Sequence, residues 1–196
     1  LAHYNLGNTL KEIGKLSEAG VSYTKAIALK PDYAEAHNNL GFTLRELGRV
    51  DEAQASCARA IGLKSDLAEA HYNLGILLKK RGRLNEAETS CKKAIALKPD
   101  DFAVAYDDLG VILQSNGKSK DAEICYRIYQ SLEPNKLSSI MSRGEFLFRK
   151  GDFEQALRIL DSYNNMTSRA IALESLYCLG RIESIYERIA SQADLD

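Results

Sequence analysis

The sequence lacks the features that would place it in several large classes of protein. Its 26 basic and 27 acidic residues leave a net charge of −1, so no overall field draws the chain to nucleic acid or to an anionic membrane. No apolar run approaches the ~20 residues that span a bilayer, so we expect no membrane insertion. Gly-rich phosphate loops, nucleophile elbows and paired carboxylates with a plausible pocket are also missing. We therefore predict no catalytic residues and no enzyme activity for this chain.

Cysteine is sparse and unpaired in its spacing. The four cysteines, Cys57, Cys91, Cys125 and Cys178, show no short paired spacing, which is typical of free thiols in a reducing compartment. We take the cytoplasm as the expected location. Because Leu1 falls at a repeat boundary, we also expect the native N-terminus to lie outside this sequence.

What the sequence does contain is a periodic arrangement of small residues. Gly7, Gly41, Gly75, Gly110 and Gly144 lie 34, 34, 35 and 34 residues apart. An alanine series keeps the same intervals, at Ala19, Ala53, Ala87, Ala122 and Ala156. A period of this size predicts a solenoid, a single elongated domain in which each unit packs against the next copy. Two small residues in each unit predict a close crossing of two helices.

Each repeat contains two stripes of apolar residues at helical spacing. In the first copy the stripe that begins at His3 predicts a helix that ends at Gly14. Ser17 then offers an N-cap for a second helix, which runs to Lys30 before Pro31 prevents its continuation. The sequence therefore predicts helix pairs.

These copies share a pattern that resembles the tetratricopeptide repeat. An aromatic residue or histidine precedes Leu-Gly and a further leucine, and the second helix carries Ala, then an aromatic residue or cysteine, then Pro. The match extends from residue 1 to about residue 163. The departures are histidine in place of tryptophan, cysteine in place of a large aromatic residue, and serine in place of proline, at His3, His37, His71, Cys57, Cys91 and Ser65.

The resemblance implies an all-α fold, a right-handed α-solenoid of antiparallel helix pairs whose first helices line a concave groove. In this family the groove commonly holds an extended peptide or a partner helix. We expect five repeats over residues 1–166, at about 1–33, 34–67, 68–102, 103–136 and 137–166. Residues 167–196 are expected to form a degenerate sixth helix pair or a capping segment, because the end units of solenoids are atypical.

A second stripe on the first helix of each pair is expected to face the groove. Its members in the first three units are Tyr4, Asn5, Asn8, Lys11, Asn38, Asn39, Phe42, Arg45, Tyr72, Asn73, Ile76 and Lys79. The fourth unit adds Asp108 and Val111. Together these residues are the predicted peptide-binding site.

Three asparagines of this stripe recur at the repeat period. Stacking should set Asn5, Asn39 and Asn73 in a row at ~10 Å spacing, where amide groups can bond an extended peptide backbone of any sequence. The row resembles the asparagine ladder of the tetratricopeptide arm of O-linked N-acetylglucosamine transferase. It ends where Asp108 and Ser142 take the corresponding positions. The alternative is that asparagine merely suits a solvated helix and was inherited through duplication without a function.

Two further rows run beside the asparagines. One is apolar, Phe42, Ile76 and Val111, and the other is basic, Lys11, Arg45 and Lys79. Together they favour a peptide with apolar and acidic residues. Partial burial between neighbouring helices is the alternative explanation of the apolar row.

Two more specific sites are not expected. The positions that match the carboxylate clamp of chaperone-binding members of the family hold Tyr4, Asn8, Asn39, Glu69 and Asn73, so two of the clamp's amides are present and all three of its basic residues are absent. Equivalent residues of adjacent units lie ~10 Å apart, too far to share a zinc ion or a disulfide. We therefore predict no metal and no cofactor, and we expect the repeated histidines and cysteines to be packing residues.

Three functions remain open from the sequence alone. The first is a non-catalytic scaffold that binds a protein or peptide segment in its groove. The second is a substrate-recognition or assembly arm of a larger enzyme, of the glycosyltransferase, sulfotransferase or oxygenase type, whose catalytic domain lies outside this sequence. The third is self-association through the repeat ends.

Overall fold

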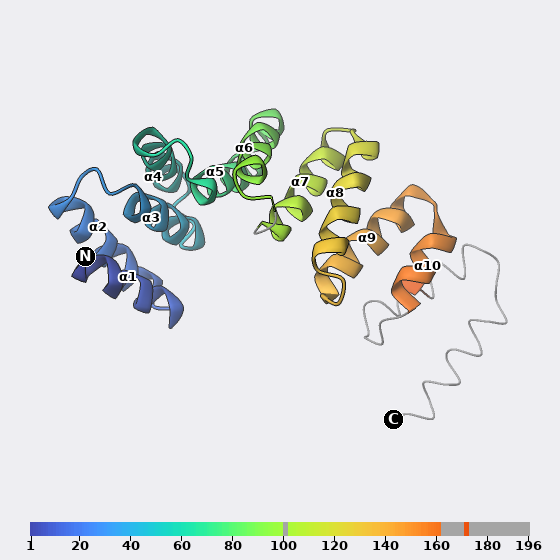
Figure 1. Cartoon of the computed structure of the whole chain (residues 1–196), viewed down its shortest axis with the longest axis horizontal. Coiled ribbons are helices and arrows are strands. Elements are labelled where there is room, and N and C mark those ends of the chain that lie inside the picture. The colour runs from blue at the N-terminus through green and yellow to red at the C-terminus, as the bar shows by residue number, and fades with distance from the viewer. Residues whose placement is uncertain (100–101, 162–170, 173–196) are drawn as a thin grey trace, which may run out of the picture. The chain divides into compact units, whose positions relative to one another are not determined.

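A computed structural model of the chain describes residues 1–99, 102–161 and 171–172. The described residues contain α-helices and no β-strand (Figure 1). The elements are α1 (Ala2–Glu12), α2 (Leu16–Leu29), α3 (Ala34–Glu46), α4 (Val50–Leu63), α5 (Ala68–Lys80), α6 (Leu84–Leu97), α7 (Ala103–Ser115), α8 (Ser119–Leu132), α9 (Leu137–Lys150) and α10 (Phe153–Asp161). None of these helices is long and apolar enough to cross a membrane. The all-α prediction is confirmed.

The chain divides into two compact units, Leu1–Ser119 and Lys120–Asp196. The sequence predicts one continuous array, and the division falls at the start of α8, inside the predicted fourth repeat. A solenoid repeat contacts only its neighbours, so an array has no shared core that would prevent such a division. The repeat boundaries stay predictions, and the expected sixth pair lies outside the described residues except for residues 171–172.

Left-handed glycines end the first helix of each pair. Gly14 has φ 77°, and its backbone N–H donates to the Lys11 carbonyl at 3.0 Å while the Lys15 N–H donates to the Leu10 carbonyl at 2.8 Å. This is a Schellman turn, which needs a residue that tolerates positive φ. The same turn recurs in the later repeats, at Gly48, Gly82, Gly117 and Gly151. The predicted helix stop is therefore confirmed.

The predicted N-cap at Ser17 is wrong. Helix α2 begins at Leu16 with Lys15 in the cap position, and no side chain caps its N-terminus. The Schellman turn returns the chain to helical geometry within two residues, and this places Ser17 inside the first turn of α2. The local turn, rather than the capping propensity of serine, sets where the helix starts.

The periodic glycines mark the place where the two helices of a pair cross. A Cβ on Gly41 would lie 2.6 Å from the Cys57 Sγ, and one on Gly75 would lie 2.5 Å from the Cys91 Sγ. Both thiols are fully buried, and burial raises the pKa of each to about 12. The packing role expected of these cysteines is confirmed, because each fills the space that its glycine leaves.

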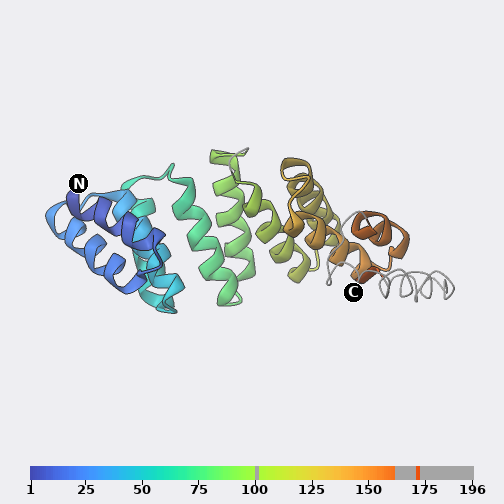
Figure 2. The ribbon, with the colours of Figure 1, turned by 90° about the horizontal axis from the view of Figure 1, so that it is seen from below.

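In the first unit, successive helix pairs follow one another in chain order (Figure 2). Small apolar residues close the junction between the second and third pairs in a cluster of Ala34, Ala60, Leu67 and Ala70. The histidines tie helices to the loops before them. The Nε2 of His37 donates to the Pro31 carbonyl at 3.0 Å, and that of His71 donates to the Ser65 carbonyl at 2.9 Å.

The second unit repeats the glycine crossing with different chemistry. A Cβ on Gly144 would lie 2.5 Å from the Leu160 Cδ2, so leucine takes the place that Cys57 and Cys91 hold at their crossings in the first unit. The Tyr126 and Phe146 rings pack with their centroids 5.2 Å apart. A small apolar cluster that includes Ile140 and Leu160 forms the core between α9 and α10.

Candidate functional site: the polar face of α1, α3, α5 and α7

The predicted groove residues lie on the first helices of successive pairs, α1, α3, α5 and α7, which contact one another in order within the first unit. The structure joins many of these residues directly, because hydrogen bonds cross from each first helix to the next. Two connected groups result. One spans α1, α3 and α5, and the other spans α5 and α7.

The first group links four asparagines and two tyrosines by hydrogen bonds, and we call it the amide network: Tyr4, Asn8, Tyr23, Asn38, Asn39 and Asn73. The Asn39 Nδ2 donates to the Asn8 Oδ1 at 2.9 Å and to the Tyr4 hydroxyl at 3.3 Å. The Asn38 Nδ2 donates to the Asn39 Oδ1 at 3.2 Å, and the Asn73 Nδ2 donates to the Asn38 Oδ1 at 3.0 Å. These bonds connect three consecutive repeats through side chains alone.

The three asparagines predicted as equivalent rungs differ in exposure. Asn5 is exposed, Asn39 is half-buried, and Asn73 is only 5% exposed. The Asn73 Oδ1 accepts a bond from the Arg45 Nη1 at 3.0 Å, so both ends of this amide are bonded within the protein. Asn73 therefore holds Arg45 and Asn38 in place and has no exposed surface for a peptide.

Among the described residues, hydrogen bonds hold the Asn8 carboxamide through its oxygen. Its Oδ1 accepts from the Tyr23 hydroxyl at 2.8 Å as well as from the Asn39 Nδ2. Tyr23 is fully buried, and burial raises the pKa of its phenol to about 12, so the hydroxyl stays protonated and can donate. An amide has two donors on its nitrogen, and fixing the oxygen orients them. The half-buried Asn8 thus presents its Nδ2 in a defined direction.

Two cations gather around one aromatic ring beside the amide network. The Lys11 Nζ lies 5.5 Å from the Phe42 ring centroid, and the Arg45 guanidinium carbon lies 4.8 Å from it. Arg45 also forms an ion pair with Glu46 at 2.9 Å. Cation–π contacts of this kind are worth roughly 0.5–2 kcal/mol depending on exposure. They hold the two cations beside the half-buried Phe42 ring.

The second connected group pairs Tyr72 and Lys79 of α5 with Asp108 of α7. The Tyr72 hydroxyl donates to the Asp108 Oδ2 at 2.7 Å, and the Lys79 Nζ lies 2.5 Å from the Oδ1. Burial and the Asp108 charge raise the pKa of the Tyr72 phenol. The cation of Lys79 is therefore compensated within the protein.

The predicted apolar and basic rows are not uniform along the chain. Ile76 is only 8% exposed and belongs to the core, whereas Val111 is 39% exposed. Of the three predicted cations, Arg45 and Lys79 each have an acidic partner, while the described residues contain no ion pair to Lys11. The structure thus gathers Tyr4, Asn8, Lys11, Asn39, Phe42 and Arg45 at α1 and α3, and leaves Asn5 and Val111 apart from them.

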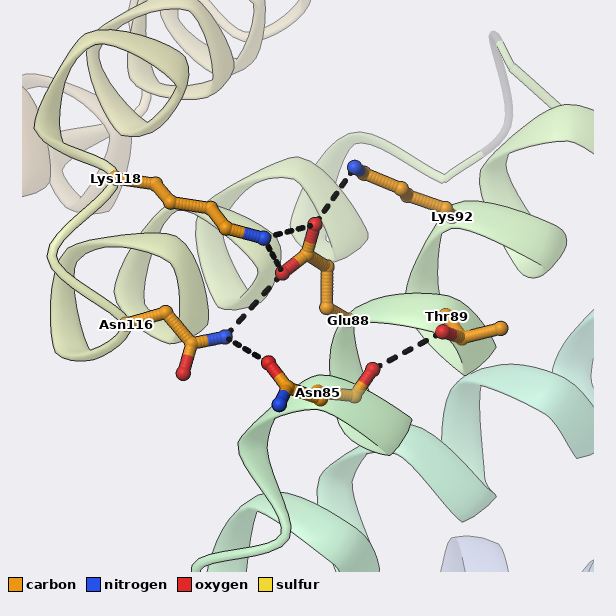
Figure 3. Close-up of polar contacts among 6 residues, drawn as sticks. All are labelled: Asn85, Glu88, Thr89, Lys92, Asn116 and Lys118. Carbon is orange, nitrogen blue, oxygen red and sulfur yellow. Dashed lines mark hydrogen bonds and ion pairs between the residues drawn. The ribbon is translucent and has the colours of Figure 1, made fainter.

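A polar cluster that was not predicted from the sequence lies on α6 and the loop after α7 (Figure 3). Glu88, 7% exposed, accepts from the Lys118 Nζ at 2.8 Å, from the Lys92 Nζ at 2.7 Å and from the Asn116 Nδ2 at 3.2 Å. The two lysines hold the pKa of the Glu88 carboxyl down at about 2. The i,i+4 spacing of Glu88 and Lys92 is a signal of this cluster in the sequence, whereas the contacts from Asn116 and Lys118 depend on the packing of two helix pairs.

The sequence matches several tetratricopeptide family models. A model described as TPR repeat matches residues 7–48, and models described as tetratricopeptide repeat match residues 34–67, 68–101 and 141–162. Two of these ranges coincide within one residue with the predicted second and third repeats. No curated protein sequence gives a significant match.

Solved structures resemble the chain over most of its length. PilF of Pseudomonas aeruginosa superposes with a TM-score of 0.82 at 19% identity, covering 99% of this chain and 90% of that protein. YrrB, described as a TPR protein with an unusual peptide-binding site, gives 0.67 at 22% identity, covering 92% and 90% of the two chains.

A third structure resembles a shorter part of the chain. The first TPR domain of Spaghetti (RPAP3), bound to the HSP90 peptide SRMEEVD, gives a TM-score of 0.57 at 24% identity, covering 59% of this chain and 91% of that one. At these identities the likeness shows the fold. With its left-handed helix stops, its glycine crossings and its matching repeat models, the chain belongs to the tetratricopeptide repeat family.

Proposed function

We propose that this protein is a non-catalytic interaction module that binds an extended segment of a partner protein along the polar face of α1 and α3. Membership of the repeat family supports a role in protein interaction. Two of its structural relatives are described as having a peptide-binding site or a bound peptide. The site consists of Tyr4, Asn8, Lys11, Asn39, Phe42 and Arg45.

The observation that carries this proposal is the oriented amide of Asn8. Its oxygen accepts two hydrogen bonds, from Tyr23 and Asn39, so its nitrogen is directed by groups that are themselves fixed in the fold. A preorganised donor loses little freedom when it binds a peptide carbonyl, and this favours binding. Asn39 keeps one lone pair on an oxygen that accepts a single bond from Asn38. The two amides together offer a donor and an acceptor to a peptide backbone.

The cations beside the amides suggest the character of the ligand. Arg45 is engaged by Asn73 and Glu46, which leaves Lys11 as the cation best placed for a ligand carboxylate. The Phe42 ring beneath Lys11 and Arg45 supplies an apolar surface at the same place. An extended segment that carries an acidic residue next to an apolar one would fit.

A receptor for a chaperone tail is not proposed. The clamp positions hold Tyr4, Asn8, Asn39, Glu69 and Asn73, none of which is basic. Glu69 carries a negative charge and pairs with Lys98 at 2.7 Å. A terminal carboxylate would therefore meet no cation at these positions.

The proposal can be tested with peptides selected from a random display library against the whole chain. The selected peptide is synthesised, and its dissociation constant is measured for the wild type and for Lys11→Glu, with Lys93→Glu at an exposed position of α6 as the matched control. We expect Lys11→Glu to weaken binding at least tenfold and Lys93→Glu to change it less than twofold. Failure to select any peptide, or equal binding by the wild type and Lys11→Glu, contradicts the proposal. Asn73→Ala is unsuitable for this test because Asn73 supports the fold.

A further inference from the structure

The second helix of each pair meets the end of the next pair's first helix along a line that we call the outer seam. At three of these seams a polar side-chain contact bridges the two elements, and we call such a seam closed. Asp51 of α4 pairs with Arg81 after α5. Glu88 of α6 binds Asn116 and Lys118 after α7, as described above. In the second unit Glu123 of α8 binds Lys150 of α9 at 2.7 Å.

The first outer seam, between α2 and the end of α3, has no such contact among the described residues. In repeat register, Gly20 takes the place of Glu88 and of Glu123, and Leu47 takes the place of Asn116 and of Lys150. Gly20 has no side chain to reach across, and Leu47 has no polar group to meet it. At the positions of Asp51 and Lys118 the first seam has Ser17 and Arg49. Arg49 pairs with Glu52 of α4 rather than with α2, so the first seam lacks the polar contact that closes the later ones.

A cleft of 560 Å³ lies at this open seam. Its wall is mainly apolar, with Gly20 and Val21 from α2 facing Leu40, Leu44 and Leu47 from α3 and the residue after it. Val21 is 56% exposed and Leu47 is 37% exposed, so these side chains are open to solvent. Ligand-binding clefts commonly occupy roughly 300–1,000 Å³, and the volume of this cleft falls within that range.

The charge at the rim of the cleft is unequally compensated. Arg49 and Glu52 neutralise each other through two bonds, from Arg49 Nε and Nη2 to the two carboxylate oxygens, at 2.7 and 2.6 Å. Lys25, one turn along α2 from Val21, also lines the cleft and forms no ion pair with the described residues. The rim therefore presents one positive charge beside an apolar wall.

We propose that the first outer seam is a second docking site, which binds a partner segment with bulky apolar side chains next to a carboxylate. The apolar side chains enter the cleft against Val21, Leu44 and Leu47, and the carboxylate pairs with Lys25. The charge complementarity selects an acidic partner over a basic one. This site lies between α2 and the side of α3 that carries Leu40 and Leu44, and it shares no residue with the groove proposed above, so one chain can engage two segments at once.

The test uses fluorescein-labelled peptides with the frame Ser-Gly-X-X-Z-Z-X-Gly-Ser, where X is Leu, Phe or Met and Z is Glu, Lys or Ser. Binding to the whole chain is followed by fluorescence polarisation. We expect saturable binding by Glu peptides and at least tenfold weaker binding by Lys peptides. A peptide with Ser at every X position should not bind.

Two variants and their matched controls locate the binding. Gly20→Gln fills the cleft, and it is tolerated because a Cβ there would meet only the Thr43 Cγ2 at 3.8 Å and the Leu40 Cδ1 at 4.0 Å. Its control is Gly62→Gln on α4, where no atom lies within 4 Å. Val21→Glu places a negative charge, the same sign as the ligand carboxylate, on the wall of the cleft. Its control, Ala55→Glu, introduces glutamate at the equivalent position of the next repeat. We expect at least tenfold weaker binding in Gly20→Gln and Val21→Glu, and less than twofold change in the controls.

The outcome separates this site from the proposed groove. These peptides also have the character proposed for the groove ligand, so the measurements are repeated in a Lys11→Glu background, where binding at the outer seam should persist and should still be weakened at least tenfold by Gly20→Gln and by Val21→Glu. The proposal is overturned if no Glu peptide binds, if Lys peptides bind equally well, or if Gly20→Gln and Val21→Glu bind like the wild type. It is also overturned if analytical ultracentrifugation shows dimers that Val21→Glu dissociates, because the cleft would then belong to a second copy of the chain.

Discussion

The glycine crossings give the sharpest test of the packing argument, and Gly75→Ala is the substitution that tests it. The new Cβ would lie 2.5 Å from the Cys91 Sγ and 3.3 Å from both the Ala87 carbonyl oxygen and the Cys91 amide nitrogen. Normal contact of non-bonded heavy atoms requires roughly 3.5–4.0 Å, so the sulfur must retreat by about 1 Å. Cys91 is fully buried, and the two backbone atoms limit the retreat.

Two opposing contributions set the expected change in the free energy of unfolding for Gly75→Ala. Overpacking of a close-packed core costs about 1–3 kcal/mol, while alanine gains about 1 kcal/mol over glycine in a helix interior. Gly20 provides the matched control, because it is also helical and a Cβ there would meet nothing closer than 3.8 Å. We therefore expect Gly20→Ala to raise the free energy of unfolding by up to about 1 kcal/mol. Gly75→Ala should be less stable than Gly20→Ala by about 1–3 kcal/mol.

Urea denaturation followed by far-UV circular dichroism measures the difference. Midpoints are compared, because repeat arrays often depart from two-state unfolding. Removing the sulfur in Gly75→Ala/Cys91→Ala should relieve the clash, so the double variant should be more stable than the sum of the single changes predicts by about 1–2 kcal/mol. If Gly75→Ala were as stable as Gly20→Ala, or the two sites were additive, the tight crossing would not be what keeps glycine at this position.

Three further predictions concern the buried polar groups and thiols. The pKa of Glu88 is lowered from 4.5 to about 2 in the folded protein, so its stabilisation is present above pH 4.5 and is lost as the pH falls toward 2. Glu88→Gln should lower the free energy of unfolding by about 1–3 kcal/mol at neutral pH, and a difference that persists near pH 2 would contradict the assignment. Asn73→Ala removes the partner of the Arg45 guanidinium and of the Asn38 amide oxygen, so it should lower the free energy of unfolding by about 2–4 kcal/mol. Thermal and urea unfolding measure this loss, and the control Asn5→Ala, at an exposed position, should lose less than about 0.5 kcal/mol. Burial raises the pKa of the Cys57 and Cys91 thiols to about 12, so both should resist iodoacetamide in the folded protein and react in urea. Peptide mass spectrometry measures the alkylation. Rapid alkylation of either thiol in the native state would show that its helix crossing opens.

The repeat sequence by itself determined the fold and its family. The period of the glycines and alanines requires neighbouring copies to pack alike, and local chemistry decides the helix ends, since only a residue that tolerates positive φ can form the turn at Gly14 and its counterparts. Periodicity also identified which helix face carries the polar residues. These features depend on the spacing of residues and on which residue types tolerate a given backbone conformation, and both can be read from the sequence.

Tertiary structure alone decided which polar residues remain exposed to a ligand. Asn5, Asn39 and Asn73 occupy equivalent positions, yet contacts from other repeats bury Asn73 and leave Asn5 exposed. Periodicity cannot reveal this, because each side chain's surroundings include residues from the preceding and following helices, such as Arg45 against Asn73. The open seam at Gly20 is a further case, since the position becomes a cleft only because its neighbour across the seam is also apolar.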